Sequence, residues 1–519
     1  MHSDSRLEIR NFRKNVIVLN KLAGKNSEIF LISQNLVSHI FQKMALDENV
    51  KPSERFLKKF PFTPTLGQAK LFELMDEFIL DEEKFRDVFM LKGYAGTGKT
   101  TFVGTLIKVL KEFGYKTVLL APTGRAAKVM SSYSKKIALT IHKKIYRQVE
   151  NAYTGALVFE RQKNNQEGTV YIVDEASMIS DVREFGTNSL LHDLLDFVFE
   201  QETNKLLLIG DEAQLPPVGI AFSPALDADH LRNRYHTSLT EHCLTEVMRQ
   251  GEGSGILTNA TDLRKQLTAE VPNIQLVTSK YRDFYRMTSE RLEDGIRYAY
   301  DKYGRENTTI ITRSNKTAVQ YNRYIRNTIN YSENELESGD MLMVVRNNYT
   351  VLGEESKAGF IANGDFVEVL KIRREEEMHG LRFANVTLKL IDYPDEEEFD
   401  TKIILNTLYS NAPTLTSEEN KLLYENVLKD YFWVKSKKER QDLLRKDSYL
   451  NALQVKFAYA LTCHKSQGGQ WDAVFIDQGY LPENQVDSDF IRWLYTAITR
   501  GVKEVFLLNF NKQFLENKE

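Results

Sequence analysis

A glycine-rich segment, GYAGTGKTT at residues 93–101, constrains the fold more than any other stretch of the chain. It follows the apolar run VFML and precedes FVGTLIKVLKEF, whose apolar residues recur with helical spacing. Gly93, Gly98, Lys99 and Thr100 match the spacing G-x-x-x-x-G-K-[ST] of a phosphate-binding loop. Glycines let the backbone bend around a phosphate and turn its N–H groups inward. The segment therefore predicts a nucleoside triphosphate site in an α/β domain, and disfavours an ordinary strand-to-helix turn.

This loop supplies candidate ligands for a triphosphate and its metal ion. In such loops the lysine reaches the β- and γ-phosphates, and the next hydroxyl binds Mg²⁺. We therefore assign Lys99 a catalytic role and Thr100 a role in binding Mg²⁺. The predicted cofactor contacts of the loop are Gly93, Ala95, Gly96, Thr97, Gly98, Lys99, Thr100 and Thr101. ATP and Mg²⁺ are the expected cofactors.

Composition indicates a folded, multidomain protein in a reducing compartment. A chain of 519 residues is too long for one core. Its net charge of −3 excludes a uniformly basic surface, but not a local basic channel. Cys243 and Cys463 lie far apart, which argues against a disulfide framework. No apolar run reaches the roughly 20 residues that span a bilayer, and the N-terminus lacks the apolar core of a secretory signal. We therefore expect a cytoplasmic protein without a membrane partner.

Strand and helix patterns alternate twice along the chain. The first alternation, from Phe62 to about Asp227, contains the apolar segments DVFMLKG, KTVLLAPT, TVYIVDEAS and KLLLIGD. It predicts a parallel sheet covered by helices. A polar, turn-rich stretch at 143–168 interrupts this pattern and indicates a hairpin. The second alternation starts near Asn307, becomes strand-rich, includes the charged stretch KSKKERQDLLRKD, and returns to sheet and helix near the C-terminus.

Polar side chains follow two predicted strands at the edge where ligands of a parallel sheet bind. Asp174 and Glu175 come directly after the apolar VYIV. Beside a phosphate loop, Asp174 is expected to hold Mg²⁺, and Glu175 to orient and deprotonate the attacking water. The alternative is a helix cap, because DEAS also suits that position. Gln214, in GDEAQLPP, suits a γ-phosphate sensor, and a polar loop is the alternative.

Three further side chains are weaker candidates when taken singly. Gln68, in FTPTLGQAK, has the amide geometry that reads N6 and N7 of adenine, although a surface glutamine is the commoner case. Arg249, in LTEVMRQ, and Arg500, in LYTAITRG, are candidates for stabilising a phosphoryl transition state. Most arginines are solvated or paired at the surface, so composition alone does not select these two.

Eight segments, taken together and in this order, resemble the superfamily 1B helicases of the RecD/Dda type. They are GYAGTGKTT, APTGRAAKVM, TIHKK, YIVDEAS, GDEAQLPPVG, LTEVMRQ, FAYALTCHKSQGGQW and WLYTAITRG, and they fall between Phe62 and Phe510. The resemblance implies an α/β fold with two RecA-like parallel-sheet domains. It also implies a β-hairpin (pin) insertion in the first domain and a small SH3-like β-barrel insertion in the second.

The same resemblance assigns roles around ATP. Gln68 becomes the adenine-reading glutamine, and Gln214, Arg249 and Arg500 become sensors of the γ-phosphate. Gln470 stands where the family more often carries a glutamate on the ribose, so it can hydrogen-bond but carries no charge. The preference for ATP over other triphosphates is therefore left open.

Contacts with a DNA strand are also implied. They are Pro122, Thr123, Thr140, His142, Thr462, His464, Lys465 and Ser466. Hydroxyls, histidines and backbone N–H groups suit phosphate contacts that carry no sequence information. For His142 or His464 alone, a hydrogen-bonded structural histidine is the alternative.

The resemblance divides the chain into domains. The expected ranges are 1–60 for an N-terminal extension of unknown role, 61–245 for the first RecA-like domain with its pin at 143–168, 246–384 and 453–519 for the second, and 385–452 for the barrel.

The implied function is an ATP-dependent DNA helicase that moves 5′ to 3′ on single-stranded DNA and unwinds duplex DNA. An ATP-gated binding or protein-displacing module without processive unwinding is the alternative, and it would use the same ATP residues. A small-molecule kinase leaves GDEAQLPPVG, CHKSQG and AITRG unexplained. The expected partners are single-stranded DNA and duplex junctions. No protein partner is identified, and a monomer is the working assumption.

Overall fold

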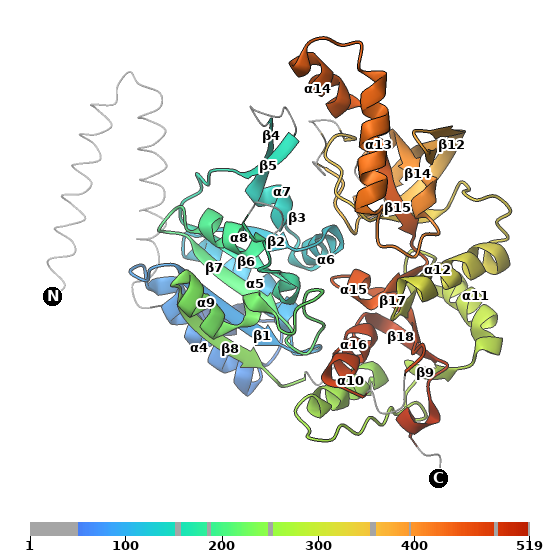
Figure 1. The fold of residues 1–519 in the computed structure, drawn as a ribbon. Coiled ribbons are helices and arrows are strands. Elements are labelled where there is room, and N and C mark those ends of the chain that lie inside the picture. Colours follow the sequence, from blue (N-terminus) through green and yellow to red (C-terminus); the bar gives the residue numbers. More distant parts are fainter. Residues whose placement is uncertain are drawn as a thin grey trace, which may run out of the picture.

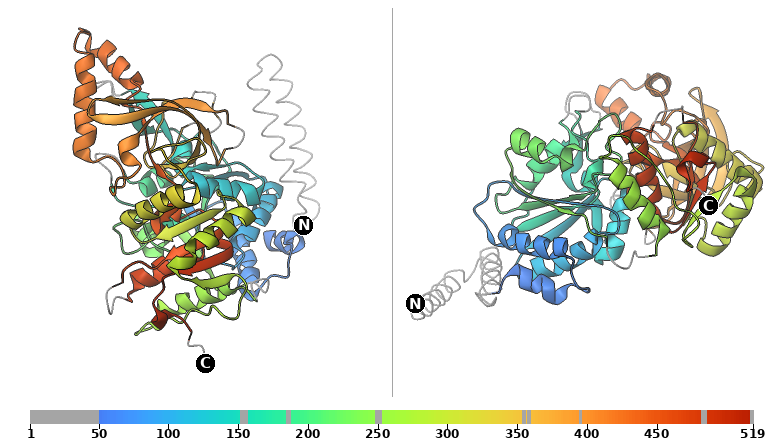
Figure 2. Two further views of the ribbon diagram at one scale, coloured as in Figure 1. Left: turned by 90° about the vertical axis from the view of Figure 1, so that its right-hand side faces the viewer. Right: turned by 90° about the horizontal axis from the view of Figure 1, so that it is seen from below.

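Two parallel sheets and a closed barrel make up the molecule (Figure 1). The computed structural model describes residues 50–150, 157–183, 188–247, 253–352, 356, 360–393, 396–481 and 486–516. The two sheet domains lie next to each other, and the barrel lies above the second one in Figure 1. Figure 2 shows the same arrangement from two further directions. The predicted N-terminal extension lies outside the described residues as far as residue 49.

The first sheet is parallel and has helices on both faces. Its strand order is β3-β2-β6-β7-β1-β8. The strands are β1 (Asp87–Gly93), β2 (Lys116–Ala121), β3 (Ala138–Thr140), β6 (Thr169–Val173), β7 (Lys205–Gly210) and β8 (Ser238–Leu244). One face packs against α3 (Pro52–Lys59), α4 (Leu66–Leu80), α5 (Lys99–Glu112) and α6 (Gly124–Ser134), and the other against α7 (Ile141–Ile145), α8 (Leu190–Val198) and α9 (Ala228–Tyr235). Because successive strand side chains point to opposite faces, Leu91 enters one core and Met90 the other.

A two-stranded antiparallel hairpin leaves this sheet between α7 and β6, as predicted. Its strands are β4 (Tyr146–Glu150) and β5 (Leu157–Arg161). The hairpin is narrower than the expected 143–168, because the residues flanking it belong to the core. Ile145 is buried, and Asn164 Nδ2 donates to the carbonyl of Phe197 at 2.9 Å.

The second sheet is built from two stretches of chain. Its order is β16-β10-β17-β18-β9, and every neighbouring pair is parallel. The strands are β9 (Phe284–Met287), β10 (Thr308–Thr312), β16 (Ala460–Thr462), β17 (Trp471–Asp477) and β18 (Gly501–Leu508). The helices of this domain are α10 (Gly255–Gln266), α11 (Leu292–Tyr303), α12 (Asn315–Tyr324), α15 (Cys463–Ser466) and α16 (Ser488–Ile498). The chain therefore leaves the sheet after α12 and re-enters it at β16.

The barrel occupies the interval between those two stretches. Its strands are β11 (Met341–Val344), β12 (Phe366–Met378), β13 (Leu381–Leu390), β14 (Phe399–Ile404) and β15 (Leu453–Phe457). β11 pairs with both β12 and β15, which closes the barrel. The barrel thus begins at Met341, well before the expected start at residue 385. Local sequence does not show this boundary, because closure depends on pairing Leu342 with the distant Phe457.

Two helices project from the barrel between β14 and β15. They are α13 (Ser417–Asp430) and α14 (Lys437–Lys446), and α14 contains most of the charged stretch noted in the sequence. A small core fixes them to the barrel, with Leu423 and Val427 packed near Phe383. No helix within the described ranges is long and apolar enough to cross a bilayer.

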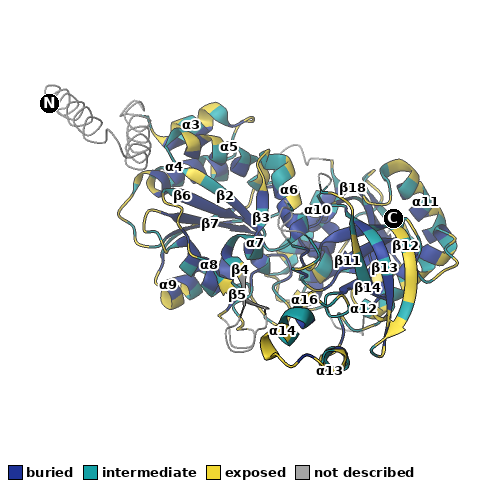
Figure 3. Ribbon diagram, turned by 90° about the horizontal axis from the view of Figure 1, so that it is seen from above, coloured by how far each residue is buried: buried dark blue, intermediate teal, exposed yellow. Residues whose placement is uncertain are grey.

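The barrel and the second sheet share one hydrophobic core. Side chains of β11 and β12 belong to the same buried cluster as those of β10, β17 and β18. Figure 3 shows these strands as mostly buried, in contrast to the exposed outer part of β12. A buried hydrogen bond reinforces the junction, because the Tyr459 hydroxyl donates to Asp340 Oδ1 at 3.0 Å. The barrel is therefore expected to move with the second sheet.

Helix α3 belongs to the first domain, although the sequence places it in the N-terminal extension. Phe56 is fully buried, and its ring stacks on those of Phe72 and Phe102, with centroids 4.9 and 5.5 Å away. The first domain therefore starts at or before Pro52.

We predict that Phe56→Ala lowers the free energy of unfolding of the first domain by about 3–5 kcal/mol, because it removes a ring from a packed core. Denaturant unfolding measures this change. Leu57→Ala is the matched control, because Leu57 is 56% exposed and its loss should cost less than about 0.5 kcal/mol. Equal stability of the two variants would show that α3 is not part of this core.

Candidate active site

The glycine-rich loop joins β1 to α5 in the conformation that its glycines allow. Gly96 and Gly98 have φ values of +77° and +87°, which favour glycine. Gly98 immediately precedes α5, so the first N–H groups of that helix face the loop. Lys99 Nζ donates to the carbonyls of Gly93 (2.5 Å) and Tyr94 (2.9 Å). The loop thus brings N–H groups and one ammonium group together at the start of α5, and their contact with a triphosphate stays a prediction.

Gln68 is buried against this loop and is not a surface residue. Its Nε2 donates to the carbonyl of Thr97 at 3.0 Å, and its Oε1 accepts from the N–H of Thr65 at 3.1 Å. The second bond completes a capping box at the start of α4. Gln68 therefore ties α4 to the phosphate loop, and its reading of adenine stays a prediction.

Asp174 and Glu175 follow β6, as predicted, and each has a distinct environment. Asp174 Oδ2 accepts from the Tyr133 hydroxyl at 2.7 Å. Glu175 adopts φ of +53°, an uncommon conformation for a non-glycine residue. Burial raises the pKa of Glu175 above its ordinary 4.5, and the nearby Arg500 guanidinium opposes this shift. A carboxyl group with a raised pKa is a better proton acceptor than an exposed glutamate.

The loop after β7 places two more groups at the same edge. Asp211 is buried, and its Oδ1 accepts from the N–H of Ala213 at 3.0 Å. Burial raises the pKa of Asp211, which Lys99 opposes. Gln214 is also buried, and its Oε1 has no hydrogen-bond partner among the described residues. A free amide oxygen can accept a hydrogen bond from the attacking water, whereas a phosphate oxygen would need the Nε2 group as its donor.

Helix α16 brings groups of the second sheet to this edge of the first. Arg500 follows the helix and is 3% exposed, and its Nη1 lies 3.6 Å from Glu175 Oε1. The Tyr495 hydroxyl donates to Asp211 Oδ2 at 2.6 Å and accepts from the N–H of Ala95 at 3.0 Å. One tyrosine thus contacts both the phosphate loop and the acidic loop after β7. The site is completed across the boundary between the two sheets.

Sequence reasoning identified Arg500 here but missed Tyr495 and Tyr133. Tyr495 lies inside the segment WLYTAITRG, yet nothing local separates it from the other tyrosines among the chain's 24. Arg249 lies outside the described residues. Gln470 is exposed, and its carbonyl accepts from Arg125 Nη2 at 3.4 Å. Its ribose contact stays a prediction.

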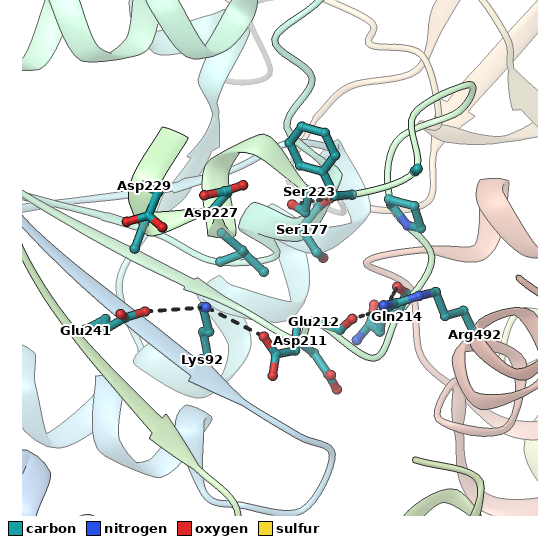
Figure 4. Close-up of a pocket in the computed structure, with 15 residues that line it drawn as sticks. Lys92, Ser177, Asp211, Glu212, Gln214, Ser223, Asp227, Asp229, Glu241 and Arg492 are labelled. Carbon is teal, nitrogen blue, oxygen red and sulfur yellow. Dashed lines mark hydrogen bonds and ion pairs between the residues drawn. The ribbon is translucent and has the colours of Figure 1, made fainter. Parts of the chain in front are cut away.

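A cavity of about 380 Å³ lies beside this site (Figure 4). Lys92 Nζ lies between Glu212 and Glu241, 3.6 and 3.4 Å from their Oε2 atoms. Asp227 and Asp229 also line the cavity. An acidic lining repels a triphosphate, so the phosphates are expected at the glycine-rich loop and not in this cavity.

A larger cavity, of about 720 Å³, separates the first domain from the barrel. Four predicted strand contacts line its first-domain side: Pro122, Thr123, Thr140 and His142. The barrel side is largely polar and carries Arg346, Asn347, Asn348, Tyr349 and Asn363. These barrel residues had no sequence signal, because they are ordinary loop residues until the barrel closes. The structure thus joins the four predicted residues into one polar channel wall.

The other four predicted contacts, Thr462, His464, Lys465 and Ser466, lie at the end of β16 and in α15. They do not line the larger cavity. Burial lowers the pKa of Lys465 to about 8, and its Nζ has no hydrogen-bond partner within the described ranges. The Ser466 hydroxyl donates to the carbonyl of Cys463 at 2.8 Å, so its hydrogen bond lies within α15.

The backbone at Gly468 lies close to the start of α6. The predicted strand contacts of β16 and α15 therefore lie near those of the first domain. Gly468 has φ of +72°, and a Cβ there would lie 2.7 Å from Ala126 Cβ and 3.0 Å from Thr123 Oγ1. Only glycine fits this contact without a shift of the backbone. The segment after α15 therefore abuts the start of α6, and the two walls meet at this point.

Comparisons with known proteins agree with this arrangement. A family model described as an AAA domain matches residues 78–279, and a UvrD-like helicase C-terminal domain matches 457–508. The ATP-dependent DNA helicase dda of Enterobacteria phage T4 is 26% identical over 85% of this chain and 98% of its own length. These matches support a helicase of the RecD/Dda type.

Two more relatives match this chain over only part of their own length. The ATP-dependent RecD2 DNA helicase of Deinococcus radiodurans is 32% identical over 27% of this chain and 18% of its own length. The uncharacterized protein MJ1519 of Methanocaldococcus jannaschii is 24% identical over 85% of this chain, which spans only 38% of MJ1519. The first family model covers most of the first sheet domain and the start of the second, and the other model covers the C-terminal part of the second domain.

We predict that Tyr495→Phe destabilises the contact between the two sheets by about 1–3 kcal/mol, because it removes the hydroxyl that accepts from the Ala95 N–H and donates to the buried Asp211 Oδ2. Thermal or denaturant unfolding measures this loss. Tyr480→Phe removes the same hydroxyl from a side chain that is 86% exposed, and it should have no effect. Equal stability of the two variants would contradict the bridging role.

Proposed function

We propose that the chain is an ATP-driven helicase that moves 5′ to 3′ along single-stranded DNA and separates duplex DNA. The observation that carries the proposal is the composite site, in which Arg500 and Tyr495 of the second sheet reach the phosphate loop and carboxylates of the first. Similarity to ATP-dependent DNA helicases supports ATP use and DNA as the substrate. The direction of movement rests on the resemblance to the RecD/Dda type.

Within this proposal the phosphate loop binds ATP, and Lys99 contacts the β- and γ-phosphates. Glu175 accepts the proton of the attacking water, and Arg500 offsets the charge that develops on the γ-phosphate. Gln214 lies at the same edge and orients the water or the phosphate.

Thr100 and Asp174 are the residues of this chain that would hold Mg²⁺, together with phosphate oxygens. The described ranges contain no cluster of three His, Cys, Asp or Glu side chains suited to a metal ion. This agrees with an ion held mainly by the nucleotide and water, which is usual for Mg²⁺. The ion would neutralise phosphate charge.

Movement along DNA follows from where the two sites lie. ATP binds between the two sheets, so its binding and hydrolysis change how firmly α16 holds the first domain. The barrel shares its core with the second sheet and faces Thr123 and His142 across the larger cavity. A change at the ATP site therefore alters the width of the channel, which we propose holds the strand.

We predict that Glu175→Gln retains ATP binding but lowers ATP turnover by about 10²–10⁴-fold, because an amide orients water but accepts no proton. Lys99→Ala should lose both binding and turnover. Nucleotide binding and steady-state hydrolysis, measured on both variants, separate the two roles. Loss of ATP binding in Glu175→Gln would contradict the assignment.

The raised pKa of Glu175 also predicts how turnover depends on pH. The turnover of the wild-type protein should begin to fall while the pH is still above 4.5, because Glu175 is already protonated there and accepts no proton.

A strand-displacement assay with 5′- and 3′-tailed duplexes tests the function itself. We predict ATP-dependent unwinding of the 5′-tailed duplex alone, and ATP hydrolysis that single-stranded DNA stimulates. The affinity for the strand should fall with salt, with a log–log slope of about −0.7 for each phosphate contacted.

Other outcomes have definite meanings. DNA-stimulated hydrolysis without displacement of either tail would favour the alternative of a DNA-binding or protein-displacing module. Unwinding from the 3′ tail alone would overturn the polarity. Hydrolysis that is equal with and without DNA would contradict coupling between the ATP site and the channel.

A further inference from the structure

The turn between α13 and α14 exposes two adjacent aromatic side chains. Phe432 is 64% exposed and Trp433 is 73% exposed. An exposed patch of large apolar side chains often marks a binding surface. The other two tryptophans of the chain, Trp471 and Trp493, are 3% and 6% exposed, so this exposure is not a general property of its tryptophans.

The turn is anchored, although its aromatic side chains are free. Val434 is buried, and the Tyr431 hydroxyl donates to Asp447 Oδ2 at 2.9 Å. Backbone bonds close the turn, from Phe432 N to the carbonyl of Lys429 (3.3 Å) and from Val434 N to that of Tyr431 (3.1 Å). The two rings are thus presented outward by a fixed backbone, which lowers the entropy lost when a ligand stacks on them.

Exposed lysines flank these rings in the sequence. The turn and its flanks carry the exposed Lys429, Lys435, Lys437 and Lys438. Within the described ranges none of the four pairs with a carboxylate. Residues 429–446 contain seven basic and three acidic side chains, in a chain whose net charge is −3. We call Lys429, Phe432, Trp433, Lys435, Lys437 and Lys438 the aromatic–basic tip.

The helices that carry the tip lie at the same end of the molecule as the β4–β5 hairpin of the first domain. Figure 1 shows α13, α14 and the hairpin at the end opposite the C-terminus. The larger cavity lies between the first domain, which carries the hairpin, and the barrel, which carries α13 and α14. The tip therefore belongs to the same body as the barrel wall of the cavity, but it does not line the cavity.

We propose that the aromatic–basic tip binds the DNA strand that is displaced during unwinding. This inference rests on the proposed helicase function. Exposed aromatic rings stack on unpaired bases, and lysines contact the phosphates between them, which is how proteins hold single strands without sequence preference. Duplex DNA offers the rings no free base face, so the single strand is the ligand that the chemistry favours.

Binding of a forked DNA with both tails, compared with the same duplex bearing only the 5′ tail, tests the tip. The 3′ tail should raise the affinity of the wild-type protein, and Phe432→Ala/Trp433→Ala should abolish that gain, a loss of about five-fold or more. The 5′-tailed duplex should bind both proteins equally. Tyr480→Ala, which removes an exposed aromatic residue elsewhere, is the control.

Tryptophan fluorescence gives a second, direct reading. A base stacked on Trp433 should quench the emission of wild-type protein when the fork binds. Trp433→Phe should retain the affinity, because phenylalanine also stacks, but should lose the quenching. Equal affinity of wild-type protein for the two DNA molecules, with no quenching, would overturn the proposal and leave a protein partner as the occupant of the tip.

The two proposals fail in different ways. Absence of strand displacement by wild-type protein would contradict the helicase function, whereas the tip is judged by the difference between the two DNA molecules. If the tip variant binds the fork as tightly as wild-type protein while wild-type protein unwinds DNA, the helicase function stands and the tip is not a DNA contact.

Discussion

The hydroxyl of Tyr495 joins three parts of the molecule that are distant in sequence. It contacts Ala95 in the phosphate loop and Asp211 after β7, and it belongs to a helix of the other sheet. The same helix adds a hydrogen bond from Leu215 N to Thr496 Oγ1 at 2.9 Å, and Arg492 donates to the carbonyl of Glu212. These polar contacts hold the second sheet against the edge where nucleotide is expected. Because they are few and specific, a change of charge at the phosphate loop can shift them.

The barrel follows the second sheet because the two share a core and a buried ion pair. Arg326 is 1% exposed and makes two 2.9 Å bonds to the carboxylate of Asp340. It also donates to the Tyr409 hydroxyl and the carbonyl of Asn334, so its guanidinium is well satisfied. A buried pair of this kind is costly to break, about 3–5 kcal/mol if one partner is removed. The second sheet and barrel therefore act as one body opposite the first domain.

Contacts between the first domain and the barrel are of a different kind. Lys128 Nζ pairs with Asp392 at 3.0 Å, and Lys143 Nζ donates to the Tyr393 hydroxyl at 3.3 Å. At Gly124, a Cβ would lie 1.9 Å from Asp365 Oδ1, so only glycine allows this approach. Charged and polar contacts of this type re-form more readily than a shared apolar core. The channel between the two bodies is thus the part of the structure best suited to change during an ATPase cycle.

Some residues of the proposed ATP site could be predicted from the sequence, namely those that lie in contiguous motifs. The loop residues Gly98 and Lys99 and the pair Asp174–Glu175 lie where strand-end reasoning places them, because parallel strands deliver their carboxyl ends to one edge. Gln68 is a candidate for reading adenine with a surface glutamine as the alternative; the structure shows it buried, where it completes the capping box of α4. No local pattern reveals a side chain that bonds to a distant backbone carbonyl.

The chain by itself determined the two parallel sheets, the hairpin, the phosphate loop and the order of motifs, since alternating apolar runs and glycine spacing are local properties. Tertiary structure alone decided where the barrel begins, that α3 belongs to the first core, and which groups complete the ATP site from the second sheet. It also decided that Phe432 and Trp433 are exposed, since their apolar character alone predicts burial. The first three of these features depend on contacts between segments that are not adjacent in sequence, or on the closure of the barrel. Hydrophobic periodicity specifies an element and its buried face, but the partner that covers this face is chosen only when the whole chain packs.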